Sequence, residues 1–250
     1  MLDQVLSITL ISLIFLLAGL VKGVLGMGLP TVAIGILGLV IAPVEAAAML
    51  VLPSLITNMW QLWAGPSFVT LSKRFWVLLV GICLGTPIGV SFITSGSVQI
   101  VSTFLGTVLT AYGLFGLSRK HFSVSPTSEK WASPVTGFFT GILMGATGIS
   151  ALPAAPYFVA LNLKKDDLIQ ALGLSFTVSS FALAVGLLAT GQFQMSVAGS
   201  SLLALIPAFA GMFVGQAVRD RLPQNIFRLC FYAGLVMLGC NMAIHAQGIV

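Results

Sequence analysis

Long apolar runs, separated by short polar or glycine-rich stretches, follow one another along the whole chain. A helix needs about 20 residues to cross roughly 30 Å of hydrocarbon, and six of the runs reach that length. The runs are continuously apolar and do not alternate, so they predict helices and not a β-barrel. The ten runs cover residues 5–21, 29–42, 44–64, 75–95, 97–117, 134–149, 151–163, 167–190, 195–217 and 225–246.

The four shorter runs form two pairs, the first with the second and the sixth with the seventh. Glycines join the members of each pair, in GVLGMG at 23–28 and in MGATGIS at 144–150. The second and seventh runs have 14 and 13 residues, enough for a helix of about 20 Å. We expect either discontinuous pairs that turn back inside the bilayer or thin, tilted spans.

The composition supports lipid as the surrounding solvent. Of the 250 residues, 58% are hydrophobic and 7% are charged, and the mean hydropathy is +1.08. A soluble domain covers its surface with about 25% charged residues. The two histidines are isolated, and Cys83, Cys230 and Cys240 lie in apolar runs without paired spacing. We therefore expect free, buried thiols, no metal site and no cofactor.

The two halves of the chain resemble each other. Several glycines recur 126 residues later, and two earlier ones recur after 118 residues. The matched glycines are 65, 85, 89 and 113 with 191, 211, 215 and 239, and 19 and 23 with 137 and 141. This self-similarity predicts two transmembrane repeats of five segments each, 1–117 and 134–250, joined by a polar linker at 118–133.

The basic residues predict an orientation. Neighbouring clusters of basic residues are separated by two apolar runs each, so all of them fall on the same side of the membrane. The positive-inside rule makes this side cytoplasmic. The clusters lie at 73–74, 119–130, 164–165 and 219–228. The loop at 65–74 is basic, whereas its repeat equivalent at 191–196 is neutral. We therefore predict inverted repeats, with both termini outside and the central loop in the cytoplasm.

The glycine stretches predict an anion site. Pro30 and Pro153 stand at or near the start of the second helix of each pair, and proline suits a first helical turn. The N-terminus of each such helix would then lie inside the protein, where N–H groups and partial positive charge favour an anion. Inversion would let the two tips meet near the midplane. The predicted substrate-binding residues are Lys22, Gly23, Gly26, Gly28, Thr31, Asn58, Gly145, Thr147, Gly148 and Ser150.

Several polar residues allow two interpretations. Lys22 either contacts substrate, or snorkels to an interface or forms a structural pair. Glu45, in the first turn of the third run, either complements the helix dipole or couples transport to protons. Ser54, Asn58 and Gln61 share one helix face. For these and for the polar residues of the eighth run, a pocket and helix–helix contacts explain the pattern equally well. The eighth-run residues are Ser175, Thr177, Ser179 and Ser180.

The stretches GLVKGVLGMGLPTVAIGILGL at 19–39 and GFFTGILMGATGISALPAAPYFVALNL at 137–163 resemble the sulfite exporter TauE/SafE family of membrane transport proteins. The layout of two similar halves around a polar centre matches over nearly the full length. The resemblance implies transport of sulfite, thiosulfate or organosulfonates, in either direction, across the bacterial plasma membrane. The family's usual glycine triplet is reduced here to Gly26-Met27-Gly28 and to Gly145-Ala146-Thr147-Gly148, which leaves the particular anion open.

We therefore expect an all-α integral membrane protein that moves a small oxyanion by alternating access, as a secondary transporter. An anion channel, or a carrier for small carboxylates, is the alternative. An intramembrane enzyme would need a nucleophile or metal set that the sequence lacks, and a structural subunit would not need discontinuous helices. The expected partners are the anion, lipid and, for uptake, a proton or sodium ion, without nucleic acid; the direction and oligomeric state are left open.

Overall fold

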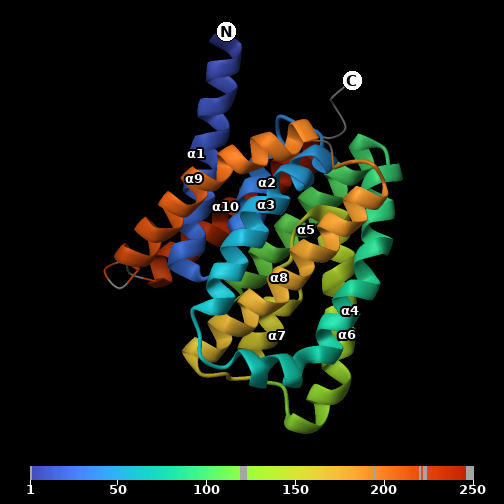
Figure 1. Ribbon diagram of the computed structural model, residues 1–250, viewed down its shortest axis with the longest axis vertical. Helices are drawn as coiled ribbons and strands as arrows, with labels where there is room; N and C mark the ends of the chain where they lie inside the picture. Colours follow the sequence, from blue (N-terminus) through green and yellow to red (C-terminus); the bar gives the residue numbers. More distant parts are fainter. Residues whose placement is uncertain (1, 119–122, 194, 220, 222–223, 246–250) are drawn as a thin grey trace. The chain divides into compact units, whose positions relative to one another are not determined.

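The computed structural model describes residues 2–118, 123–193, 195–219, 221 and 224–245. These residues form ten α-helices and no β-strand (Figure 1). The prediction of an all-α protein is confirmed, and each predicted run has its helix. In chain order the helices are α1 (Leu2–Leu25), α2 (Leu29–Leu37), α3 (Pro43–Trp63), α4 (Phe68–Ser95), α5 (Val98–Leu117), α6 (Pro126–Thr147), α7 (Ala154–Ala160), α8 (Lys165–Ala189), α9 (Met195–Val218) and α10 (Gln224–His245).

Helices α1 and α6 are longer than the apolar runs that predicted them. They have 24 and 22 residues because each helix continues into polar residues. At the start of α6 the Ser125 hydroxyl accepts a hydrogen bond from the Ser128 N–H at 3.3 Å, and Pro126 occupies the first turn. Helix α6 therefore begins inside the predicted 118–133 linker.

Helices α2 and α7 are shorter than predicted, with 9 and 7 residues. At 1.5 Å per residue they measure about 13 and 10 Å, well short of the roughly 30 Å of a hydrocarbon core. The alternative of thin, tilted spans therefore does not hold for these two helices. Each is the short member of a discontinuous pair, α1 with α2 and α6 with α7.

Four described helices are long and apolar enough to cross a membrane: Phe68–Ser95, Val98–Leu117, Asp166–Ala189 and Ser201–Val218. Helix α3 falls outside this set because polar residues such as Asn58 and Gln61 interrupt it. The described apolar stretches of α1 and α10, Thr9–Leu25 and Arg228–Ile244, are shorter than the four spans. Large apolar side chains cover the outer surfaces, including Trp63, Trp131, Ile206 and Met237, each more than 70% exposed. Apolar exposure on this scale requires lipid around the helices.

The chain forms two compact units, and each unit takes helices from both halves of the sequence. The first unit consists of Met1–Pro53, Ser97–Arg119 and Met195–Val250, and the second of Ser54–Gly96 and Lys120–Gln194. The boundary at Pro53 falls within α3. The compact units therefore differ from the predicted sequence repeats, which describe similarity along the chain and stay a prediction.

In the first unit, α1 packs along α9 and α5 packs along α10, while α2 contacts α1, α5 and α10 (Figure 1). Glycines let α1 and α9 approach closely. A Cβ atom at Gly19 would overlap the carbonyl oxygen of Ala208, and one at Gly211 would overlap that of Leu16. Small residues at such crossings allow backbone contact between membrane helices.

In the second unit, α4 packs along α6, and α8 contacts α4, α6 and α7. Glycines line the crossing of α4 and α6 from both sides. A Cβ atom at Gly89 would overlap the carbonyl oxygen of Ile142, and one at Gly141 would overlap that of Ile82. The glycines matched by the repeat thus lie at backbone contacts in both units, α1 on α9 and its equivalent α6 on α4, which supports the predicted repeat.

Candidate functional site

The first glycine tip reverses the chain between α1 and α2. Gly26 has φ of 75° and Gly28 has φ of 104°, values that favour glycine over residues with a side chain. The Gly26 N–H donates to the Lys22 carbonyl at 2.7 Å, and the Val32 N–H donates to the Gly28 carbonyl at 2.9 Å. Helix α2 then begins at Leu29 with Pro30 in its first turn. The prediction that this helix begins at the tip is confirmed.

The N-terminus of α2 carries an unpartnered hydroxyl. The Thr31 side chain is 1% exposed, and its Oγ1 has no hydrogen-bond partner among the described residues. The first N–H groups of any α-helix also lack partners inside the helix, and they carry partial positive charge. A buried polar group without a partner costs about 1–3 kcal/mol. An oxyanion is the kind of ligand that accepts hydrogen bonds from free donors at a helix N-terminus.

Lys22 lies in the last turn of α1, next to the tip. Its side chain is 2% exposed, so it does not reach a membrane interface and the snorkelling interpretation is wrong. A lysine at a helix C-terminus complements the negative end of the helix dipole. A substrate contact and a structural role both agree with this position, and the predicted contact stays a prediction.

Two of the predicted site glycines lie at helix crossings. A Cβ atom at Gly23 would overlap the carbonyl oxygen of Met212 on α9, and one at Gly145 would overlap that of Thr86 on α4. Helix packing therefore accounts for both glycines without a ligand. Their contact with substrate stays a prediction.

The second glycine tip differs from the first. Gly148 caps α6 with φ of 73°, and its N–H donates to the Met144 carbonyl at 2.8 Å. The Thr147 hydroxyl donates to the Leu143 carbonyl at 2.6 Å and accepts from the Ile149 N–H at 3.2 Å. This hydroxyl is therefore used within the tip. Ser150 follows, buried at 1% exposure.

Helix α7 does not begin at this tip. Gly148 is followed by five non-helical residues, and Pro153 precedes the helix as its N-cap. The expectation that a second half-helix starts directly at the glycines is wrong here. With 7 residues, α7 has fewer than two full turns of aligned peptide dipoles. The α2 tip is consequently the stronger candidate for an anion.

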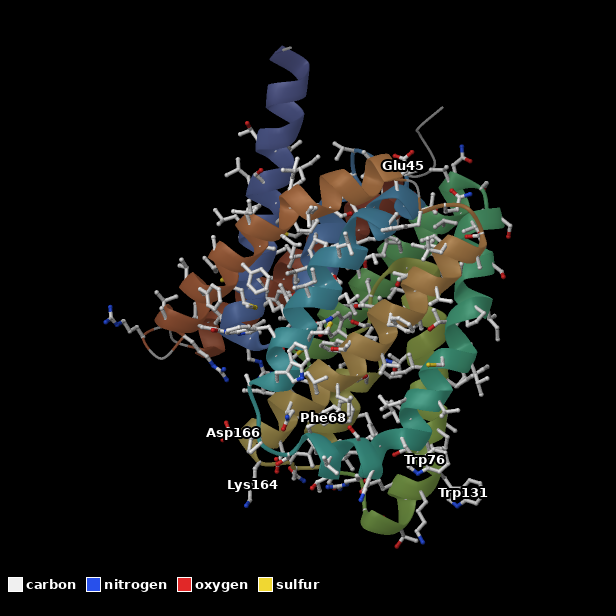
Figure 2. The ribbon with its side chains drawn as sticks, in the orientation of Figure 1. Glu45, Phe68, Trp76, Trp131, Lys164 and Asp166 are labelled. Carbon is white, nitrogen blue, oxygen red and sulfur yellow. The ribbon has the colours of Figure 1, made fainter. Side chains whose placement is uncertain are left out.

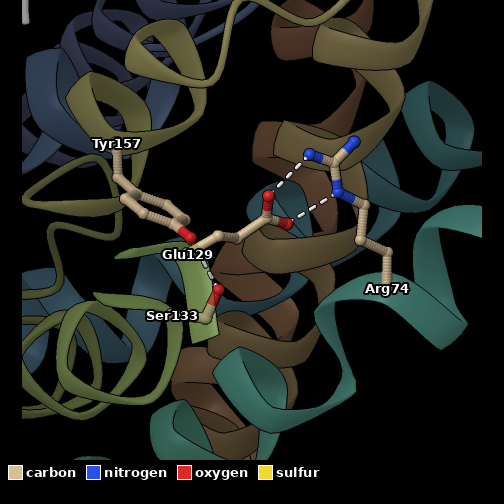
Figure 3. Close-up of polar contacts among 4 residues, drawn as sticks. All are labelled: Arg74, Glu129, Ser133 and Tyr157. Carbon is tan, nitrogen blue, oxygen red and sulfur yellow. Dashed lines mark hydrogen bonds and ion pairs between the residues drawn. The ribbon is translucent and has the colours of Figure 1, made fainter. Parts of the chain in front are cut away.

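A polar network holds α7 against α6 (Figure 3). The Ser133 and Tyr157 hydroxyls are 2.6 Å apart and hydrogen-bonded. One turn before Ser133, Glu129 accepts two hydrogen bonds from Arg74 on α4, at 2.6 and 2.8 Å. Phe158 packs edge-on against Phe75, with ring centroids 5.0 Å apart. Sequence reasoning missed this network because its hydrogen-bonded partners are 24 to 55 residues apart in the chain.

Asn58 belongs to the second unit and joins α3 to α8. Its Nδ2 donates to the Ser180 Oγ at 3.3 Å, and both residues are buried. The Gln61 Nε2 donates to the Ile169 carbonyl at 2.9 Å. Helix–helix contacts are therefore shown for Asn58 and Gln61, and the substrate contact of Asn58 stays a prediction.

Sequence reasoning missed Gln170 on α8. Its side chain is 1% exposed, and its Nε2 donates to the Leu62 and Gly65 carbonyls.

Glu45 lies in the first turn of α3, as predicted, and its side chain is exposed (Figure 2). A carboxylate there complements the positive end of the helix dipole. The position agrees with the structural interpretation. A role in proton coupling stays a prediction.

One end of the second unit gathers basic and aromatic residues. Figure 2 shows Lys164, Trp76 and Trp131 at this end, beside Phe68 and Asp166. Lys73, Lys130 and both tryptophans are exposed. Tryptophan and lysine are typical of a membrane–water interface, and this grouping agrees with one shared face for these charges. Arg119, Lys120 and both chain termini lie outside the described residues.

The described part of the chain was also searched for metal-binding groups and for disulfides. No three His, Cys, Asp or Glu residues lie close enough there to hold a metal ion. Cys83, Cys230 and Cys240 are free and exposed. The expectation of buried thiols is wrong because these residues lie on faces that lipid, and not protein, would cover.

Comparison with known proteins agrees with this picture of a membrane protein. A family model described as "Sulfite exporter TauE/SafE" matches residues 11–242. The "Probable sulfite/organosulfonate exporter TauE" of Cupriavidus necator is 25% identical over 231 residues, which cover 89% of this chain and 88% of the relative. No solved structure matches the chain. The protein is thus a multi-pass membrane transport protein and not an enzyme, and it belongs to the sulfite exporter TauE/SafE family.

Proposed function

We propose that the protein is a secondary transporter that exports a small sulfur oxyanion, sulfite or an organosulfonate, across the bacterial plasma membrane. The name of the Cupriavidus necator relative supports the substrate class and the direction. The observation that carries the proposal is the buried, unpartnered Thr31 hydroxyl in the first turn of α2. It marks a helix N-terminus whose donors are oriented for a negatively charged ligand.

The first tip supplies the parts of such a site within one unit. Gly26 and Gly28 adopt the left-handed backbone that reverses the chain, so α2 begins directly at the tip. Lys22 adds a buried positive charge close by in the chain. Among the residues named from sequence, Lys22, Gly26, Gly28 and Thr31 are therefore the substrate contacts that we favour. Thr147, Gly148 and Ser150 are proposed as contacts from the second tip.

Transport proceeds by alternating access, in which one half of the chain rocks against the other half. Discontinuous helices near the substrate site are typical of secondary transporters. The short helices α2 and α7 are the elements of this kind in the described chain. Movement about the glycine tips would change which side of the membrane the anion can reach.

The membrane potential is sufficient to drive export. An inside-negative potential of about 100 mV favours the exit of a monovalent anion by about 2.3 kcal/mol. Export therefore requires no coupling ion. Uptake against the same potential would require a proton or a sodium ion, and Glu45 is the candidate carboxylate for the proton.

The test is counterflow in liposomes that contain the purified protein. Labelled sulfite is added outside, with sulfite, methanesulfonate, sulfate or acetate in excess inside. We expect saturable influx that internal sulfite or methanesulfonate accelerates and that protein-free liposomes lack. Flux that does not saturate and is not accelerated would indicate an anion channel. Acceleration by acetate and not by sulfite would indicate a carboxylate carrier.

A further inference from the structure

The loop of the first tip carries a single side chain. Gly26, Met27 and Gly28 connect α1 to α2, and both glycines have positive φ. Glycine loses more conformational freedom on folding than any other residue, so this loop is costly to order. Within the loop, only Met27 can make side-chain contacts with the rest of the protein.

Tyr112 on α5 contacts this side chain. Its hydroxyl donates a hydrogen bond to the Met27 Sδ, and the two atoms are 3.5 Å apart. Tyr112 is 1% exposed and is the largest fully buried side chain among the described residues. A thioether is a weak acceptor, so this hydrogen bond is weaker than one to a carbonyl oxygen. The contact therefore orders the loop and can still break and re-form.

Neighbouring aromatic rings fix Tyr112 in place. Its ring packs edge-on against Tyr232 and Phe231 on α10, with centroids 5.7 and 6.4 Å apart. A Cβ atom at Gly116 on α5 would overlap the Tyr232 ring, so this glycine makes room for the cluster. Because the three rings pack together, the Tyr112 hydroxyl meets the loop from a fixed position.

Phe231 contacts the same loop from α10. A Cβ atom at Gly28 would lie 3.3 Å from two atoms of the Phe231 ring. The loop thus meets α5 through Met27 and α10 through Gly28, and these two helices pack along each other. Leu29, the first residue of α2, follows Gly28 directly. The position of the loop therefore sets the position of the α2 N-terminus.

We infer that Tyr112 is a positioning residue for the first tip and that it acts through Met27. Its hydroxyl orders the loop before the anion arrives, so the donors at the start of α2 already have their binding arrangement. This inference rests on the proposed function, because it concerns the same anion site. Such preorganisation raises affinity, since the loop loses little further freedom when the ligand binds. The weak acceptor keeps the order reversible, as a transport cycle requires.

The test compares variants that remove either side of this contact. Tyr112→Phe removes the hydroxyl and keeps the ring, and Met27→Leu removes the sulfur and keeps an apolar side chain of similar size. Thr107→Val is the matched control, since Thr107 on the same helix is exposed and donates to the Thr103 carbonyl. Hydrogen–deuterium exchange of the segment 26–32 is measured in detergent, together with melting temperature. The KM and kcat for sulfite are measured in liposomes.

The inference predicts a specific combination of results. Each single variant should speed exchange in the segment 26–32 about two- to fivefold, the effect expected for the loss of one weak hydrogen bond. The KM for sulfite should rise by a similar factor while kcat is kept, because the order of the loop acts on binding. The double variant should resemble either single variant, since the two side chains form one contact. Thr107→Val should match wild type throughout.

Other results would overturn the inference. Wild-type exchange and KM in Tyr112→Phe would show that the hydroxyl does not position the loop, and a change in kcat alone would contradict a role in binding. The Tyr112 hydroxyl also interacts with Tyr232. An equal effect of Tyr232→Phe, with none from Met27→Leu, would assign the hydroxyl to that neighbour instead.

The inference and the proposed function can fail separately. Wild-type protein that moves no sulfur oxyanion would refute the proposed function. The exchange measurement needs no transport, so it would still show whether Tyr112 orders the loop through Met27. Wild-type protein that transports sulfite, with variants that exchange and transport like wild type, would refute the positioning role alone.

Discussion

The guanidinium of Arg74 on α4 and the carboxylate of Glu129 on α6 form a two-point ion pair. The Arg74 Nε lies 2.6 Å from the Glu129 Oε1, and the Nη2 lies 2.8 Å from the Oε2 (Figure 3). The side chains are 41% and 17% exposed, so solvent weakens the attraction. The pair links α4 to the part of α6 that also holds α7 through Ser133 and Tyr157.

Glu129→Gln removes the charge of this pair and keeps the size of the side chain. We expect a loss of about 0.5–1 kcal/mol in stability, because the pair is partly exposed and the two-point geometry is favourable. Melting temperature in detergent, measured at low and high salt, checks the result. The neighbouring exposed Lys130→Gln is the control. Equal melting temperatures for wild type and Glu129→Gln would show that the pair does not stabilise the fold.

Gly89→Ala tests the crossing of α4 and α6. The added Cβ would overlap the Ile142 carbonyl oxygen, so the helices must separate, at a cost of about 1–3 kcal/mol. Gly234→Ala is the matched control, since a Cβ there meets no atom within 4 Å. We expect a lower melting temperature for Gly89→Ala and an unchanged or higher one for Gly234→Ala. Similar behaviour of the two variants would contradict the close crossing.

Gly28→Ala tests the first tip. Gly28 has a left-handed backbone conformation, which is about 1 kcal/mol less favourable for a residue that has a side chain. The added Cβ would also lie only 3.1 Å from the Val21 side chain and 3.3 Å from the Phe231 ring. We expect sulfite flux to fall strongly while membrane insertion is kept. Gly191→Ala is the control, because Gly191 has φ of 71° and open space around it. Wild-type flux in Gly28→Ala would exclude the tip from the transport site.

Lys22→Met removes the buried charge and keeps most of the side-chain volume. If Lys22 contacts the anion, the KM for sulfite in liposomes should rise about tenfold, while the melting temperature stays close to that of wild type. Lys164→Met, at an exposed lysine, is the control. An unchanged KM would assign Lys22 to a structural role at the end of α1.

Thr31→Val removes the unpartnered hydroxyl at the start of α2 and keeps the branched shape. The variant should be as stable as wild type or more so, because a buried polar group without a partner disappears. Its affinity for sulfite should fall, as measured by the anion-induced shift in melting temperature. Reduced stability with unchanged affinity would indicate that the hydroxyl serves the fold and not the ligand.

The apolar runs and the prolines were sufficient to predict the helices and the start of α2. Helix formation depends on local hydrophobic patterns, so ten runs correspond to ten described helices. The start of α7 was not predictable in the same way. Pro153 suggested a helix directly at the second tip, but five non-helical residues separate Gly148 from Ala154. Proline is compatible with several backbone positions around a helix start, and the surrounding packing selects one of them.

The sequence by itself determined the lipid environment, the ten helices, the glycine tips and the family to which the chain belongs, because each depends on local composition or on motifs. Only the tertiary structure decided that Gly23 and Gly145 lie at helix crossings and that Lys22 is buried. It also decided that the Ser175 and Ser179 hydroxyls have no hydrogen-bond partner among the residues that the structure describes. These properties depend on which helices pack together across long distances in the chain. A glycine or serine in an apolar run has the same local pattern whether it faces lipid, a neighbouring backbone or a ligand.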